Sequence, residues 1–164
     1  MEPIRLNVYI HAPIEDVFDA LTDHEGYASY PGVGSAKLLT PGDTERNGLG
    51  ARREIRALGA RFVEDITRFE RPTRMDYLIR ECSLPIRHLG GSMTFTRRGE
   101  GTEVDWKSSV EPALPVGGRV FSTLMRPLTI EGFTRFLLAA KERLEHRAAK
   151  KATLGISTAD RPSA

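Results

Sequence analysis

Hydrophobic and polar residues alternate with a period of two at the start of the chain. Over residues 4–11, IRLNVYIH, every second side chain is aliphatic, which is typical of a β-strand with one buried face. After Pro13 the apolar residues of IEDVFDAL recur at three- and four-residue spacing, which predicts a short amphipathic helix. Gly26 and Pro31 limit the helix that follows to about two turns.

Short polar turns divide residues 33–112 into six segments with strand-like alternation. The turns are PGDTERNG, LGA, ERPTR, the stretch before SMTFT, and RRGEG. Turns this short join antiparallel neighbours, because parallel strands need long crossover connections. Apolar residues share one face of the later strands, and charged residues such as Asp76 and Asp105 occupy the opposite face. The sheet therefore needs a cover on its apolar side.

The last segment of the chain predicts that cover. Apolar residues recur at helical spacing from about residue 118 to residue 146, and Pro127 is expected to kink or interrupt the helix. Beyond Arg147 the periodicity is lost, so we expect residues 147–164 to form a flexible tail. The prediction is a single α+β domain over residues 1–146, in which a strand, two short helices and six strands precede one long helix. About seven antiparallel strands would curve around that helix.

One helix cannot fill a strongly curved sheet, so we expect an apolar cavity between them. The order of elements resembles the SRPBCC superfamily, also called START-like or birch-pollen-allergen-like, which has the helix-grip fold. IHAPIEDVFDALTDHEGYASYPGV is similar to the opening of that family. RFVEDITRFERPTRMDYLI and SMTFTRRGEGTEVDWKSSVEP resemble its polyketide cyclase/dehydrase-like branch. The resemblance covers about residues 3–146 and implies the fold; the superfamily includes carriers, cyclases, receptors and chaperone regulators, so it does not choose among activities.

Composition and charge narrow the classes of partner. Hydrophobic residues make up 40% and charged residues 28% of the chain, a balance typical of soluble globular domains. No apolar run is long enough to span a bilayer, so we expect a cytoplasmic protein without stable membrane insertion. A net charge of +2 does not indicate nucleic-acid binding. Cys82 is the only cysteine, and no histidine has metal-ligand spacing, so neither a metal nor another cofactor is expected.

A few polar residues are candidates for chemistry inside the cavity. If alternation persists through MDYLIREC, Glu81 shares the inner face of Tyr77 and could pair with Arg53 or Arg87 to orient a substrate carbonyl or carboxylate. The alternative is a salt bridge at the rim. His88 is the candidate general acid or base, because an ordinary histidine titrates near neutrality, and its alternative is a turn residue beside two glycines.

The expected ligand-binding residues combine these polar groups with the apolar face of the sheet and helix. Tyr27 and Tyr30 are predicted to line the entrance, with ordinary packing as the alternative. The remaining predicted lining residues are Arg53, Ile55, Tyr77, Ile79, Arg87, Met93, Phe95, Trp106, Phe121, Leu124, Met125 and Leu128.

Three functions follow from these expectations. The first is binding of a hydrophobic small molecule of lipid, polyketide or aromatic type. The second is a polyketide cyclase, aromatase or dehydrase-like enzyme, with Glu81 and His88 as its catalytic residues. The third is a protein-interaction module, which is less favoured because the exposed strand faces are charged. The sequence leaves the ligand and the oligomeric state open.

Overall fold

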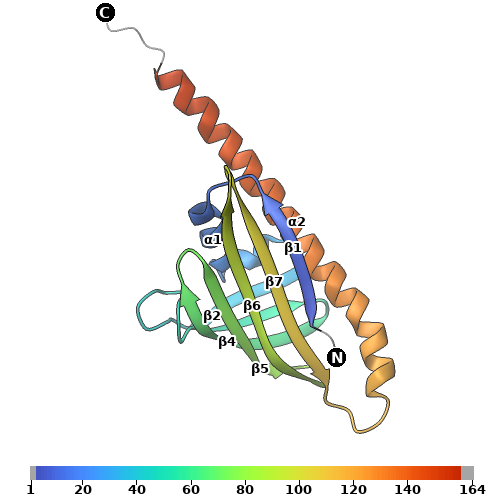
Figure 1. Cartoon of the computed structure of the whole chain (residues 1–164). Coiled ribbons are helices and arrows are strands. Elements are labelled where there is room, and N and C mark those ends of the chain that lie inside the picture. The colour runs from blue at the N-terminus through green and yellow to red at the C-terminus, as the bar shows by residue number, and fades with distance from the viewer. Residues whose placement is uncertain (1–2, 160–164) are drawn as a thin grey trace, which may run out of the picture.

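A computed structural model describes residues 3–159 and shows an antiparallel sheet with one long helix across it (Figure 1). The chain begins with β1 (Ile4–Ile10), α1 (Ile14–Thr22) and the short 3-10 helix η1 (Gly26–Ser29). Six strands follow: β2 (Val33–Thr40), β3 (Arg52–Ala57), β4 (Ala60–Glu70), β5 (Arg74–Cys82), β6 (Ile86–Arg98) and β7 (Gly101–Pro112). The last element is α2 (Gly118–Ala159).

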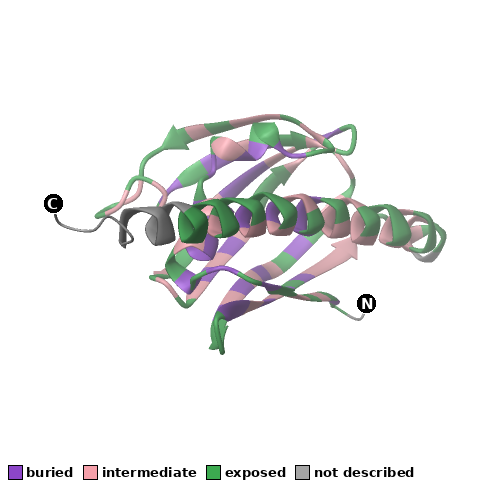
Figure 2. Ribbon diagram, turned by 90° about the horizontal axis from the view of Figure 1, so that it is seen from above, coloured by how far each residue is buried: buried purple, intermediate pink, exposed green. Residues whose placement is uncertain are grey.

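The seven strands form one curved sheet in the order β1-β7-β6-β5-β4-β3-β2, and every neighbouring pair is antiparallel. β1 pairs with β7, and all other neighbouring strands in the sheet are consecutive in the chain. Helix α2 crosses the inner face of the sheet, and the buried residues lie beneath it (Figure 2). The predicted helix-grip α+β fold is confirmed.

A dense core lies at the end of the sheet that α1 covers. Phe18 on α1 is completely buried, and its ring meets those of Phe69 and Phe95 at 5.1 Å in edge-to-face geometry. Met75 and Met93, which face each other across β5 and β6, are also fully buried. These side chains fill the space between α1 and the sheet, so the other end of the fold is where a cavity can form.

Helix α2 continues to Ala159, beyond residue 146, where the sequence predicted the helical domain to end. The stretch AAKKATL consists mostly of strong helix formers, which explains the extension in spite of its lost periodicity. Lys151 also forms an ion pair with Asp16 of α1 at 2.8 Å. Residues 160–164 of the predicted tail lie outside the described residues. The helix runs through Pro127 without interruption.

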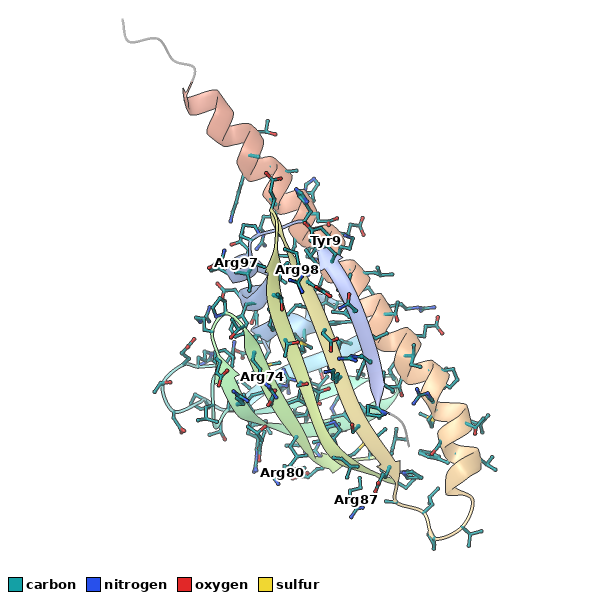
Figure 3. The ribbon with its side chains drawn as sticks, in the orientation of Figure 1. Tyr9, Arg74, Arg80, Arg87, Arg97 and Arg98 are labelled. Carbon is teal, nitrogen blue, oxygen red and sulfur yellow. The ribbon has the colours of Figure 1, made fainter. Side chains whose placement is uncertain are left out.

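The outer face of the sheet is rich in arginine (Figure 3). Arg74 pairs with Asp76, Arg80 with Asp65, and Arg98 with Glu103, all at 2.8–2.9 Å. This face is therefore charged and paired rather than apolar. Within the described part of the chain, no helix combines the length and hydrophobicity needed to cross a membrane.

Candidate ligand-binding site

A cavity of about 160 Å³ lies between the inner face of the sheet and α2. Residues of all seven strands contribute to its wall, together with η1 and the segment after it, the β3–β4 and β5–β6 turns and one face of α2. The residues at one end of the wall, among them Tyr27, Tyr77 and Trp106, are buried. Residues of the opposite end, such as Leu58 and Phe121, are partly or largely exposed. The cavity thus runs from a buried end toward solvent.

Aromatic rings dominate the wall near α2. The rings of Trp106 on β7 and Phe133 on α2 are stacked, with centroids 4.0 Å apart and planes 7° apart. Phe136, one turn further along α2, meets Trp106 and Tyr27 edge to face, at 5.8 and 5.0 Å. Flat faces and edges of this kind suit contact with another ring system.

A buried ion pair stands at the closed end of the cavity. Arg53 and Glu64 both line the wall and are only 2% and 6% exposed. The Nε and Nη2 groups of Arg53 donate to Oε2 of Glu64, at 2.8 and 2.7 Å. The guanidinium carbon lies 4.9 Å from the centre of the Tyr27 ring and 5.5 Å from that of Tyr77. Two aromatic faces and one carboxylate therefore hold the arginine in place.

The hairpin between β3 and β4 explains why these two residues meet. Its two-residue turn, Leu58 and Gly59, has positive φ at both positions, 53° and 76°. Ala57 therefore pairs with Ala60, and the same register sets Arg53 directly opposite Glu64. Glu64 is not among the residues predicted from the sequence, although the two-residue LG turn, with four residues between it and Arg53 on one side and Glu64 on the other, could have identified it.

The surroundings keep the arginine charged and the tyrosines protonated. Burial opposes the charged form of Arg53, but the Glu64 carboxylate and the Tyr27 hydroxyl outweigh this and raise its pKa. Burial raises the pKa of both Tyr27 and Tyr77. The Tyr27 hydroxyl donates to the backbone carbonyl of Leu21 at 2.5 Å. The closed end thus contains one permanent cation, paired with one anion.

His88, the predicted acid or base, lies behind the cavity wall. It is 7% exposed and stacks on the Tyr77 ring, with centroids 5.3 Å apart. Its Nδ1 accepts the Ile79 backbone N–H at 3.0 Å, so Nε2 carries the proton and donates to Ser108 Oγ at 3.1 Å. Burial lowers the pKa of His88 to about 4. The ring is therefore neutral, and both nitrogens are engaged.

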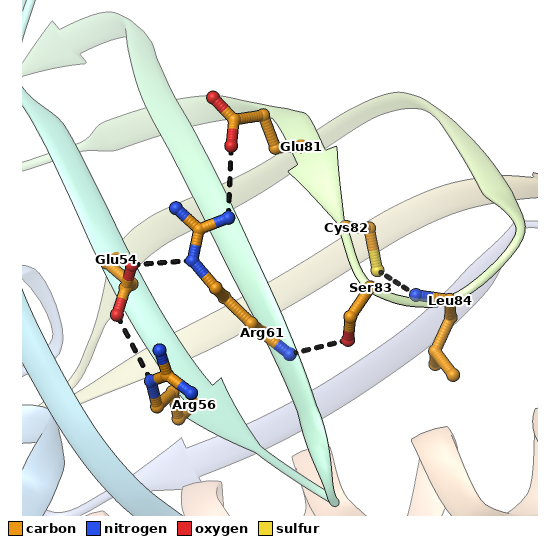
Figure 4. A network of polar contacts seen from close by, with 7 residues as sticks. All are labelled: Glu54, Arg56, Arg61, Glu81, Cys82, Ser83 and Leu84. Carbon is orange, nitrogen blue, oxygen red and sulfur yellow. Dashed lines mark hydrogen bonds and ion pairs between the residues drawn. The ribbon is translucent and has the colours of Figure 1, made fainter.

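The inner orientation expected for Glu81 and Arg87 is wrong. The side chain of Glu81 is 60% exposed and accepts a hydrogen bond from Arg61 Nη1 at 3.0 Å, in an outer network that includes Glu54 (Figure 4). The side chain of Arg87 is 71% exposed and pairs with Glu111 at 2.6 Å.

Two β-bulges cause this difference. The pairing of β4 with β5 shifts after Ile79, and that of β6 with β7 shifts between His88 and Gly90. Each extra residue reverses the alternation of faces, so a strict period of two misplaces the residues beyond it. Gly90, with φ of 131°, marks the second bulge, and the Gly90-Gly91 pair was its signal in the sequence.

The other predicted lining residues divide into three groups. The cavity wall includes Tyr27, Arg53, Ile55, Tyr77, Ile79, Trp106, Phe121 and Met125. Tyr30, Met93 and Phe95 are buried in the core, away from the wall. Leu124 and Leu128 are 65% and 53% exposed on the outer side of α2. Besides Glu64, the wall includes Ser108, Phe133 and Phe136, which are not among the predicted lining residues. The alternation of Trp106 with Ser108 and the helical spacing that includes Phe133 were signals for two of them.

His24 is a second buried histidine close to the site. It is fully buried after the end of α1, and its ring meets Tyr27 edge to face at 6.1 Å. Among the described residues neither ring nitrogen has a hydrogen-bond partner. Burial, with the nearby charge of Arg53, lowers the pKa of His24 to about 2. Within the same residues, no cluster of three or more acidic, histidine or cysteine side chains could hold a metal ion.

A sheet that grips a C-terminal helix and leaves an apolar cavity defines the START-like class of helix-grip proteins. The sequence profile of the family described as "Polyketide cyclase / dehydrase and lipid transport" matches residues 1–145, so the chain belongs to this family. The predicted superfamily and branch are confirmed.

Solved structures show the same fold. The protein TTHA0849 from Thermus thermophilus is 25% identical, with a TM-score of 0.74 over 90% of this chain and 99% of that chain. A START superfamily protein from Mycobacterium smegmatis is 17% identical, with a TM-score of 0.70 over 87% of this chain and 98% of that chain. A comparison with curated proteins found no match.

Proposed function

We propose that this protein binds a hydrophobic small molecule, of lipid, polyketide or aromatic type, in the cavity between the sheet and α2. The observation that carries the proposal is an apolar cavity of about 160 Å³ beside a cluster of buried hydrophobic side chains. An engineered apolar cavity of roughly 150 Å³ is large enough to bind benzene. The enclosed part therefore accommodates about one ring, and a longer ligand would extend toward the partly exposed end. The family description, which includes lipid transport, agrees with this function.

Cyclase chemistry is the weaker candidate, because it requires a proton donor or acceptor in contact with the ligand. Both nitrogens of His88 are engaged behind the wall, and Glu81 lies on the outer face. A protein-interaction role for the outer sheet is also less favoured, since its arginines are paired with carboxylates.

The test uses two adjacent residues of α2 that differ in position. Met125 lines the cavity, whereas Leu124 is 65% exposed. Binding of the neutral fluorescent probe N-phenyl-1-naphthylamine would be titrated in the wild type, Met125→Trp and Leu124→Trp. We expect Met125→Trp to fill the cavity and weaken binding by about fourfold to fifteenfold, because the probe would lose contact equivalent to one or two buried methylene groups at about 0.8 kcal/mol each. Leu124→Trp should bind like the wild type. Equal affinity in both variants, or no binding by the wild type, would refute the proposal.

A further inference from the structure

The cavity wall includes Arg53, a side chain with one hydrogen-bond donor group that has no partner in the described part of the chain. Arg53 is 2% exposed, and its Nη1 group has no acceptor among the described residues. A buried polar group without a partner is costly and rare in folded proteins, and the cost is greater for a charged one. Since Arg53 is part of the cavity wall, a bound molecule can supply the missing acceptor.

The other polar side chains that line the closed end take part in hydrogen bonds within the fold. Trp106 Nε1–H donates to the Tyr77 hydroxyl at 3.0 Å, and the Tyr27 hydroxyl donates to a backbone carbonyl. Ser108 Oγ is bonded to His88. The closed end of the cavity therefore offers a donor to a ligand, and the ligand group that fits is an oxygen or another acceptor.

The charge of that acceptor is restricted by Glu64. Its carboxylate lies 2.7 Å from Arg53 Nη2, so the buried pair has no net charge. A carboxylate ligand would leave one uncompensated negative charge in a water-poor, low-dielectric space, whereas a carbonyl accepts the same hydrogen bond and adds no charge. The remaining ionisable residues of the wall do not offset this. Glu111 is itself an anion and pairs with Arg87, and Arg126 belongs to the partly exposed half of α2.

We propose that the ligand is a neutral, ring-containing molecule whose carbonyl-type oxygen accepts a hydrogen bond from Arg53 Nη1, and that Glu64 selects against carboxylates. This inference rests on the proposed function, because it assumes that the cavity is a ligand site. The stacked rings of Trp106 and Phe133 form the apolar surface against which the ligand's ring would lie.

Three probes of matched size separate the two parts of the inference. Acetophenone has the ring and a neutral carbonyl, benzoate has the ring and a carboxylate, and ethylbenzene has the ring alone. Affinities would be measured by calorimetry, and binding would be located by the ¹⁵N–¹H signals of Arg53 Nε and Trp106 Nε1. Because a hydrogen bond to a charged group is worth about tenfold or more in affinity, we expect acetophenone to bind at least that much more tightly than either of the others.

Two variants test which residues are responsible. In Glu64→Gln the pair becomes a net cation, so benzoate should bind about tenfold more tightly than it binds the wild type. The double variant Arg53→Met with Glu64→Met replaces the ion pair by apolar side chains of similar size, a change that folded proteins often tolerate. It should bind acetophenone and ethylbenzene with equal affinity. It also keeps the test decisive if Glu64→Gln does not fold.

Each result decides a different claim. Ethylbenzene binding the wild type as tightly as acetophenone, or the double variant keeping the preference for the ketone, would overturn the role of Arg53. Benzoate binding the wild type more tightly than acetophenone would overturn the selection by Glu64. Failure of all three probes to bind the wild type would overturn the proposed function and this inference with it.

Discussion

Mild acid should destabilise this protein, because two histidines are buried as neutral rings. His24 has no hydrogen-bond partner for either nitrogen among the described residues, and His88 Nδ1 accepts a backbone N–H. A proton on His24 would add a charge to a dry interior that already holds Arg53, whose charge helps to lower the pKa of His24. A proton on His88 would break the bond to Ile79. Both rings therefore resist protonation in the folded state.

The size of the effect follows from the two pKa values. Both fall from the ordinary 6.5, to about 2 for His24 and about 4 for His88. Between pH 6.5 and these values the unfolded chain binds more protons, so the free energy of unfolding decreases as the pH falls through this window. One pKa unit corresponds to about 1.4 kcal/mol, so at pH 5.0 each histidine lowers stability by about 2 kcal/mol and both by about 4 kcal/mol. The carboxylate pairs act mainly at lower pH, because glutamate ordinarily titrates near 4.5.

The assay is urea unfolding at pH 7.5, 6.0 and 5.0, followed by the fluorescence of Trp106, the only tryptophan of the chain. His24→Leu should halve the loss of stability between pH 7.5 and 5.0, and so should His88→Asn, whose amide oxygen can still accept the Ile79 N–H. His146→Asn, at an exposed position of α2, is the control and should keep the wild-type difference. A wild-type stability that does not change over this range, or a His24→Leu protein with the full loss, would refute the reasoning.

Two further predictions concern the cavity wall, and both are measured by urea unfolding at pH 7.5. Glu64→Leu should lower the free energy of unfolding by about 3–5 kcal/mol, because Arg53 is left buried and unpaired. The double Met variant should recover most of this loss. A Glu64→Leu protein as stable as the wild type would contradict the argument. Gly91→Ala should lower the free energy of unfolding by about 1–3 kcal/mol, because the new Cβ would overlap the Tyr77 ring. Gly34→Ala is its control, since the nearest atom to the new Cβ is 3.6 Å away, and equal losses in the two variants would show that the overlap is relieved.

The fold could be predicted from the sequence because its signals are local. Alternation in residues 4–11, short polar turns and the helical spacing after Gly118 each depend on near neighbours in the chain, and together they indicate a sheet that wraps one helix. The end of α2 was missed for the opposite reason. Beyond residue 146 the intrinsic helix propensity of Ala, Lys and Leu maintains the helix without an apolar stripe.

The site was predicted less completely, because it depends on strand register. Arg53 was placed correctly on the inner face, but its partner was expected on β5 instead of the neighbouring β4. Two bulges then reversed the faces of Glu81 and Arg87, and one extra residue is enough for each reversal. The turn at Leu58 and Gly59 contained the missing information, since a two-residue hairpin fixes the pairing of every residue that flanks it.

The electrostatics of the closed end also bear on whether the cavity holds its ligand or converts it. A general acid or base must exchange protons near neutral pH, yet His88 remains neutral well below it and Tyr77 remains protonated well above it. Arg53, with its raised pKa, can polarise a carbonyl but cannot release a proton. Any reaction in this cavity would therefore depend on the pair of Arg53 and Glu64 and on a proton carried by the ligand or by water. Such turnover would persist in Glu81→Gln and be lost in the double Met variant, whereas a pure carrier would lose only its preference for the carbonyl.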